Sequence, residues 1–221
     1  EIVQIRKSVR LNEEVFQEVY DSLCGTDTEI DVALRISALM KNRGAERESF
    51  DTIVAAGPES SLPHAMPGNT RCLNDSPVVI DMGLVLDGYC SDMTRSFYFG
   101  KADEKYMRIH RIVRQAQQQG IAAVRAGVSG RAIDKAAREV IAEAGYGEYF
   151  GHALGHGVGM AVHENPRVSP KSGKRLQAGM VVTIEPGIYI PGWGGIRLEN
   201  MVVVREDGCE NLNTDTTCLD L

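Results

Sequence analysis

The stretch GHALGHGVGMAVHENP, residues 151–166, is the part of the chain around which the rest is organised. It holds three of the five histidines, His152, His156 and His163, and glycines occupy positions 155, 157 and 159. Imidazole is the commonest metal ligand, and glycine permits positive φ and the close approach of other atoms. Because so many glycines disfavour a helix, the HExxH helix of zinc proteases is excluded. We expect a looped or extended segment that directs imidazoles into a pocket; the alternative is a glycine-rich surface loop.

Residues 77–99 predict a β-hairpin that carries two aspartates. Two apolar runs, PVVIDMGLVL and YCSDMTRSFYF, flank an Asp-Gly pair at positions 87–88, the strongest short-range hairpin signal. With a two-residue loop, Asp81 faces Thr94 and shares one face of the hairpin with Asp92, on a diagonal of about 7 Å between Cβ atoms. Carboxylates at that separation can reach one pair of metal ions. The alternative for either aspartate is a bond to nearby backbone or to an arginine.

A second pair of carboxylates lies on a second predicted hairpin. Residues 180–190, MVVTIEPGIYI, predict a strand, and the turn PGWGG leads into IRLENMVVV. If the loop is a symmetric five-residue one, Glu199 faces Gly187, and Glu185 shares its face on a diagonal. A bulge would shift this register.

The order of predicted elements repeats. Apolar periodicity predicts helices over residues 3–23, 28–44, 104–124 and 132–144, and a short strand over 50–56. Residues 1–99 and residues 103–203 therefore each run helix, helix, strands, with one carboxylate pair in each half. This order predicts an α+β fold in which two αβ halves surround a shared site.

Composition excludes several classes of function. The net charge of −6, without a cluster of lysine and arginine, argues against nucleic acid as a partner. We find no apolar run near the roughly 20 residues that a membrane helix needs, and no signal peptide. Five widely spaced cysteines without a CxxC pair favour a reduced, cytoplasmic protein. Because the chain starts at Glu1, we expect a fragment or a processed form.

The candidate ligand set has a distinctive chemistry. Mostly oxygen donors with one nitrogen suit harder divalent ions such as manganese, iron or cobalt, with zinc as an alternative, and do not suit a structural zinc site. Such a set is large enough for two ions. The candidate ligands are Asp81, Asp92, His156, Glu185 and Glu199.

These motifs resemble those of the pita-bread metallopeptidases, a family that includes methionine aminopeptidase, aminopeptidase P, prolidase and creatinase. The resemblance covers about residues 4–204 and implies a single catalytic domain over residues 1–221. That domain would consist of two pseudo-symmetric αβ halves with a curved antiparallel sheet. The matching motifs are IDMG with Asp81, SDMTRSF with Asp92, GHGVG with His156, VHENP with His163, TIEPG with Glu185 and IRLEN with Glu199.

The resemblance also implies a division of the metal ligands. Asp81 would hold one ion, and His156 and Glu185 would hold the other. Asp92 and Glu199 would bridge both ions.

Further residues take roles only through this resemblance. Glu185 would also accept a proton from the bridging water, and His163 would stabilise the tetrahedral oxyanion. His64 matches a histidine that lines the family's substrate pocket, with a plain loop histidine as the alternative. Arg197 would support a ligand carboxylate.

The resemblance favours the proline-specific branch of the family. Its markers are His152, the SDMTRSF motif, and Arg197 where methionine aminopeptidases usually carry glutamine. It implies an exopeptidase that uses two divalent ions, with manganese as the favoured metal. The substrates would be small peptides with proline at the second position, and the chain would form a homodimer. The alternatives are a methionine aminopeptidase and a non-catalytic peptide-binding module. Asn200 departs from the family pattern, which commonly has aspartate there, and the preceding domain of proline-specific members is absent from this chain.

Overall fold

The computed structural model describes residues 1–72 and 75–221. Its α-helices lie where the periodicity predicts, with ends that shift by at most two residues: α1 (Ile2–Ser22), α2 (Glu29–Asn42), α3 (Glu104–Ala123) and α4 (Gly130–Glu143). Helix α2 begins where Thr28 and Asp31 form a capping box, and α4 begins after Ser129, whose side chain accepts from Ala132 N. Among the described residues, we find no helix with the length and apolarity needed to cross a membrane.

In the part of the chain that the structure describes, the strands form four antiparallel groups: β1-β4-β5, β2-β3-β6, β10-β11 and β13-β12-β9-β7-β8. In the first half they are β1 (Arg47–Glu48), β2 (Ile53–Ala56), β3 (Ser76–Met82), β4 (Leu84–Leu86), β5 (Tyr89–Cys90) and β6 (Met93–Phe99). In the second half they are β7 (Gly155–Gly157), β8 (Glu164–Val168), β9 (Val181–Ile184), β10 (Gly187–Ile190), β11 (Gly194–Arg197), β12 (Asn200–Val204) and β13 (Cys209–Asn211). Two 3₁₀ turns, η1 (Gly57–Ser61) and η2 (Gly147–Tyr149), complete the elements.

The first hairpin has the predicted register. Asp81 is the partner of Thr94, and Asp87 and Gly88 turn with φ of 51° and 78°, the positive values that a type I′ turn requires. The hairpin bends at Gly83, where a Cβ would lie 2.2 Å from the Ser91 carbonyl oxygen. This close approach separates β3 from β4, so one predicted strand becomes two.

The second hairpin differs from the prediction. Gly187 pairs with Arg197 and Ile190 pairs with Gly194, so the loop has three residues and not five. The last two glycines of PGWGG belong to β11. Position 195 requires glycine because a Cβ there would lie 2.1 Å from the Ser60 carbonyl oxygen of η1. The glycine that we assigned to a turn serves close packing, which was not visible in the sequence.

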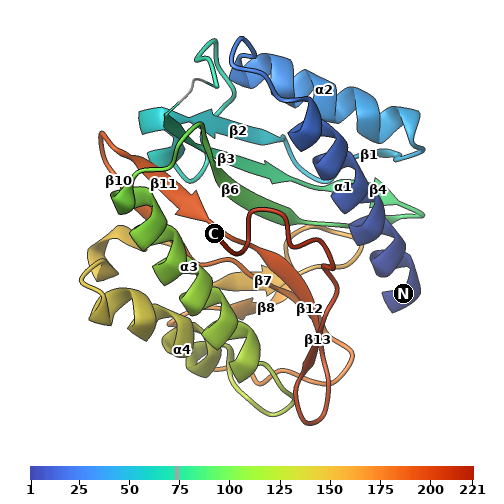
Figure 1. Cartoon of the computed structure of the whole chain (residues 1–221). Coiled ribbons are helices and arrows are strands. Elements are labelled where there is room, and N and C mark those ends of the chain that lie inside the picture. The colour runs from blue at the N-terminus through green and yellow to red at the C-terminus, as the bar shows by residue number, and fades with distance from the viewer. Residues whose placement is uncertain (73–74) are drawn as a thin grey trace.

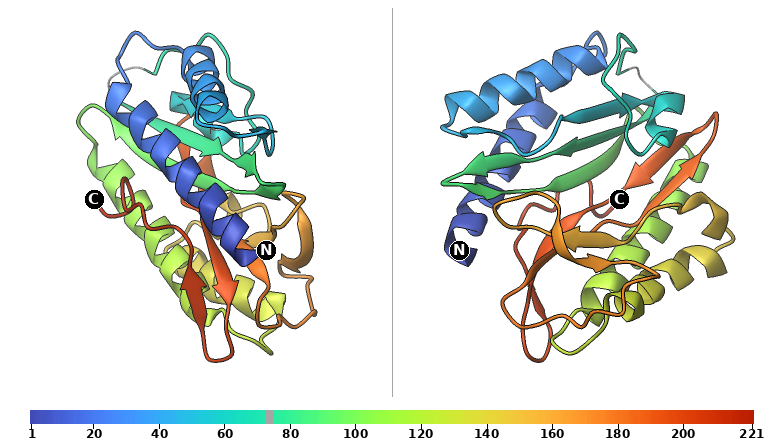
Figure 2. Two further views of the ribbon diagram at one scale, coloured as in Figure 1. Left: turned by 90° about the vertical axis from the view of Figure 1, so that its right-hand side faces the viewer. Right: turned by 180° about the vertical axis from the view of Figure 1, so that it is seen from behind.

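Each half has its own hydrophobic core. Side chains such as Phe16, Val32 and Ile80 pack α1 and α2 against β3, while Ile109 and Val202 belong to the cluster between α3, α4 and the second set of strands. Figure 1 shows the two halves above and below a central region where β6 meets β11 and β12. From behind, the strands lie in front of α1 and α3 (Figure 2), so the helices cover one side of the curved sheet.

Candidate metal centre

Glycines around His156 allow other backbone segments to approach it closely. A Cβ on Gly155 would lie 2.0 Å from the Thr183 carbonyl oxygen, and one on Gly157 would lie 2.6 Å from the Asn165 carbonyl oxygen. Both glycines are in β7, and neither has the positive φ that the sequence allowed. The segment that we expected to be looped or extended is thus partly a strand, tightly packed between β8 and β9, which fixes the direction of the His156 side chain.

The two glutamates face each other directly and not on the predicted diagonal. Asn200 pairs with Ile184 on one side of them, and Gly187 pairs with Arg197 on the other. The common register of these pairs sets Glu185 opposite Glu199. Glu185 lies between β9 and β10, and Glu199 lies between β11 and β12. The strands are interrupted at these residues, and after Glu185 the next residue is Pro186, which has no backbone N–H to donate to a ladder.

The structure brings the predicted ligands of both halves together. His156 Nε2 lies 3.3 Å from Glu185 Oε1 and 3.6 Å from Asp92 Oδ2. One ligand atom each from Asp92, His156 and Glu199 lie within 4.8 Å of one another. Asp92 lies between β5 and β6, His156 lies in β7, and Glu199 lies between β11 and β12, so the cluster forms only when the two halves pack.

Neighbouring side chains hold three of the carboxylates in place. Thr94 Oγ1 donates to Glu199 Oε2 at 2.7 Å, and Arg197 Nη2 donates to Asp81 Oδ2 at 2.6 Å. Thr183 Oγ1 donates to Glu185 Oε1 at 3.1 Å. The other oxygen of Asp81, Oδ1, is buried and has no hydrogen-bond partner among the described residues. A buried acceptor without a donor suits a cation ligand.

Burial and mutual repulsion perturb the whole cluster. Burial, followed by the charges of neighbouring carboxylates, raises the pKa of Asp92 and that of Glu199 well above the ordinary values. Burial raises the pKa of Glu185 to about 8 and lowers the pKa of His156 to about 4. Like charges this close, beside a neutral imidazole, form a donor set that divalent cations would stabilise. The residues therefore fit the metal ions that the sequence predicts.

Arg197 connects the cluster to a residue that the sequence analysis missed. Its Nη1 donates to Tyr189 Oη at 2.8 Å, and His152 Nε2 lies 2.9 Å from the same oxygen. Burial lowers the pKa of His152 to about 4, so its ring is neutral at pH 7. Alternation along the strand was the available signal, because Tyr189 lies four residues after Glu185 and therefore on the same face.

The other two predicted histidines are exposed. The rings of His163 and His156 are edge to face, with centroids 4.3 Å apart, so His163 lies beside the cluster on its open side. His64 is exposed on the loop after η1, and the carbonyl of its neighbour Pro63 accepts from Arg197 Nη1 at 3.2 Å. The loop of His64 is therefore tied to the same arginine as Asp81.

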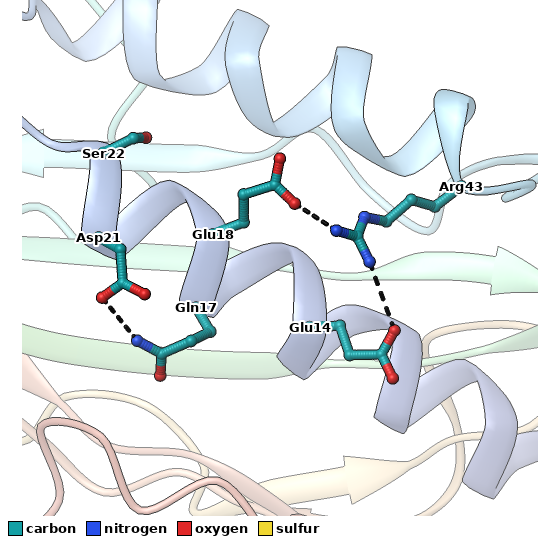
Figure 3. A pocket seen from close by; sticks show the side chains of 6 residues that line it. All are labelled: Glu14, Gln17, Glu18, Asp21, Ser22 and Arg43. Atoms are coloured by element: carbon teal, nitrogen blue, oxygen red, sulfur yellow. Dashed lines mark hydrogen bonds and ion pairs between the residues drawn. The ribbon is translucent and has the colours of Figure 1, made fainter.

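A second group of acidic side chains provides a contrast. A surface hollow of about 520 Å³ between α1 and α2 is lined by Glu14, Gln17, Glu18, Asp21, Ser22 and Arg43 (Figure 3). There Arg43 pairs with both Glu14 and Glu18, and Gln17 donates to Asp21. Exposed carboxylates with an arginine between them need no metal, unlike the buried cluster.

Comparisons with known proteins show the family of the chain. The family model described as metallopeptidase family M24 matches residues 3–206. The Xaa-Pro dipeptidase of Pyrococcus furiosus is 42% identical over 212 residues, which cover 96% of this chain and 61% of the relative. The peptidase YqhT of Bacillus subtilis, described as uncharacterized, is 40% identical over 208 residues, 94% of this chain and 59% of the relative.

Solved structures match equally well. The X-Pro aminopeptidase from Thermotoga maritima superposes with a TM-score of 0.95 at 40% identity, over 97% of this chain and 61% of that chain. The prolidase from Pyrococcus furiosus gives 0.95 at 41% identity, over 97% and 64%. The chain thus spans about three-fifths of the length of these relatives.

Proposed function

Because the chain belongs to metallopeptidase family M24, we propose that it is a metal-dependent exopeptidase that cleaves the bond between an N-terminal residue and a following proline. The observation that carries the proposal is a cluster of four carboxylates and one imidazole, drawn from both halves of the fold. Asp81, Asp92 and Glu199 are buried in it, and His156 and Glu185 are partly buried. Relatives named Xaa-Pro dipeptidase, prolidase and X-Pro aminopeptidase support this substrate class.

Two divalent ions would fill the cluster. Asp81 would hold one ion, His156 and Glu185 the other, and Asp92 and Glu199 both. Ions bound here would polarise a peptide carbonyl and lower the pKa of a bound water. The oxygen-rich set favours manganese, with cobalt, iron or zinc as substitutes.

The chain's own residues would then act on the peptide and its protons. Glu185 would accept a proton at its carboxylate, which its contact with Thr183 Oγ1 keeps oriented. His163, on the open side of His156, would donate a hydrogen bond to the carbonyl oxygen as negative charge develops there. Arg197 would orient Asp81, and His64 and His152 would line the pocket around the proline.

The proposed site tolerates a proline at the scissile bond. An Xaa-Pro bond is a tertiary amide without an N–H, so a site that required this donor would reject it. Here the donors and cations would act on the carbonyl side of the bond. No residue in the proposed arrangement requires a hydrogen bond from the scissile nitrogen.

Two further predictions from the sequence belong to this proposal. A cytoplasmic location fits the five cysteines, all of which are free in the structure. A homodimer is the assembly that the family resemblance suggests, and neither nucleic acid nor a membrane is an expected partner. Gel filtration of the purified chain would test the dimer.

A peptide panel tests the activity. After loading with manganese or cobalt, the chain is assayed on an Xaa-Pro dipeptide, an Xaa-Pro-Pro tripeptide and a Met-Ala-Ser peptide, with Asp92→Asn as the inactive control. Faster cleavage of the dipeptide would indicate a dipeptidase, and of the tripeptide an aminopeptidase. Preferential release of methionine from Met-Ala-Ser would contradict the specificity and favour a methionine aminopeptidase. Binding of all three peptides without cleavage would favour the non-catalytic module.

A further inference from the structure

One buried carboxylate holds both ends of the loop that carries His64. Glu29 Oε1 accepts from Ala56 N and Oε2 accepts from Gly68 N, each at 2.8 Å. Glu29 is only 2% exposed, although it is the first residue of α2. A charged group at such a position is retained when both of its oxygens are satisfied, and here the satisfying donors are the two ends of one loop.

The first turn of α2 reinforces the same end of the loop. Glu29 N donates to the Thr70 carbonyl at 2.9 Å, and Ile30 N donates to the Gly68 carbonyl at 3.1 Å. The first amides of a helix have no partners within the helix, so the loop supplies carbonyls that these amides need. Residues 56–70 are therefore anchored at the start of α2.

The middle of the loop is anchored to the other half of the fold. Gly195 N donates to Ser60 Oγ at 2.9 Å, and Arg197 Nη1 donates to the Pro63 carbonyl at 3.2 Å. His64 follows Pro63 and is exposed, so its position depends on the path of the backbone and not on burial of its ring. The ends of this path are set by Glu29.

From these contacts we infer that Glu29 is a positioning residue that holds residues 57–68 so that His64 faces the substrate. The inference rests on the proposed function, because it assigns to His64 a contact with substrate. Glu29→Gln is the sharpest change: the amide keeps the size of the side chain but has one accepting oxygen, so one of the two backbone amides loses its acceptor.

Hydrogen exchange tests the anchoring without any assay of activity. In the metal-loaded chain, Glu29→Gln should speed amide exchange in residues 56–68 by about tenfold or more, because loss of a buried acceptor favours local opening. Glu59→Gln, the same change at an exposed glutamate on this loop, should leave exchange unchanged. Asp31→Asn removes a carboxylate from the same helix turn and controls for fraying of α2. Exchange in Glu29→Gln that equals that of either control would overturn the inference.

A double-mutant cycle tests the link to His64. Glu29→Gln should lower kcat/KM for the best Xaa-Pro peptide by roughly tenfold with metal content unchanged, and should add little to the loss in His64→Ala. A purely structural role would give additive losses, and that result would overturn the inference. If the wild-type chain cleaves no peptide, the proposed function fails, whereas the exchange experiment still decides whether Glu29 anchors the loop.

Discussion

Arg197 Nη2 lies 2.6 Å from Asp81 Oδ2, and this ion pair joins β11 of one half of the fold to β3 of the other. Both side chains are nearly buried, with 5% and 12% exposed. The same guanidinium reaches Tyr189 Oη, Thr94 Oγ1 and the Pro63 carbonyl. It therefore fixes one oxygen of Asp81 and leaves the other free for a cation.

Replacement of Arg197 by lysine should weaken metal binding. A lysine cannot reproduce the several N–H contacts of the guanidinium, so Asp81 would lose its fixed orientation. We expect the affinity for manganese to fall about 10–100-fold, the usual scale for partners of metal ligands. Calorimetric titration measures this change. Arg35→Lys, which alters the ion pair between Arg35 of α2 and Asp27 just before that helix, is the matched control, and an equal loss in both variants would contradict the role of Arg197.

The metal-free cluster should be a source of instability. Because burial and neighbouring charges raise the pKa of Glu199, Glu199→Gln should raise the Tm of the metal-free chain by about 2–4 °C, which corresponds to about 1 kcal/mol at this size. Glu13 is a matched control: it is also buried but accepts from Thr214 N and Asp215 N, so Glu13→Gln should lower the Tm. Calorimetry of both variants without metal checks the pair, and a lowered Tm in Glu199→Gln would contradict the repulsion.

Local signals predicted the helices and the first hairpin. Apolar periodicity, the Thr28 cap and the Asp-Gly turn each depend on a few neighbouring residues, and the structure has all of them. The pita-bread fold and the family, inferred from motifs, are confirmed by the structural and sequence matches. The second hairpin was predicted wrongly, because Gly195 is required by contact with η1, a segment distant in sequence.

The candidate site was predictable as a set of ligand types but not as a network. Motifs nominated His156 and the four carboxylates, and the structure brings residues from both halves together. Tyr189 and Glu29 escaped notice because each acts through partners that only tertiary packing supplies. Which ion each ligand holds, and which ligands bridge both ions, are predictions that metal-binding measurements on variants would test.

His163 should act on the reaction and not on metal binding. It is exposed beside His156, so its removal should leave the fold and the ions in place. We expect His163→Ala to lower kcat by roughly 10²-fold or more, the scale for one oxyanion donor. His163→Gln, which keeps an N–H donor, should recover part of the rate. Loss of bound metal in the alanine variant, or full activity, would reassign this residue.

His110 should make stability depend on pH. Its Nε2 lies 2.9 Å from the Cys218 carbonyl, and burial lowers its pKa in the folded chain. The unfolded chain therefore binds a proton more readily, so the stability contributed by the neutral ring is complete above about pH 6.5 and is lost as the pH falls below it. His110→Gln, which keeps an N–H donor, should lose less stability between pH 7.5 and pH 5.5 in urea denaturation. An equal or larger loss in the variant would contradict this assignment.

The number of ions bound per chain tests the central claim most directly. Native mass spectrometry of the manganese-loaded chain measures it without any assumption about the substrate. We predict a mass increase of two ions in the wild type and a reduced occupancy in Glu199→Gln, with both proteins folded. A wild-type chain that binds no ion would contradict the metal centre, and saturation at one ion would contradict its two-ion form.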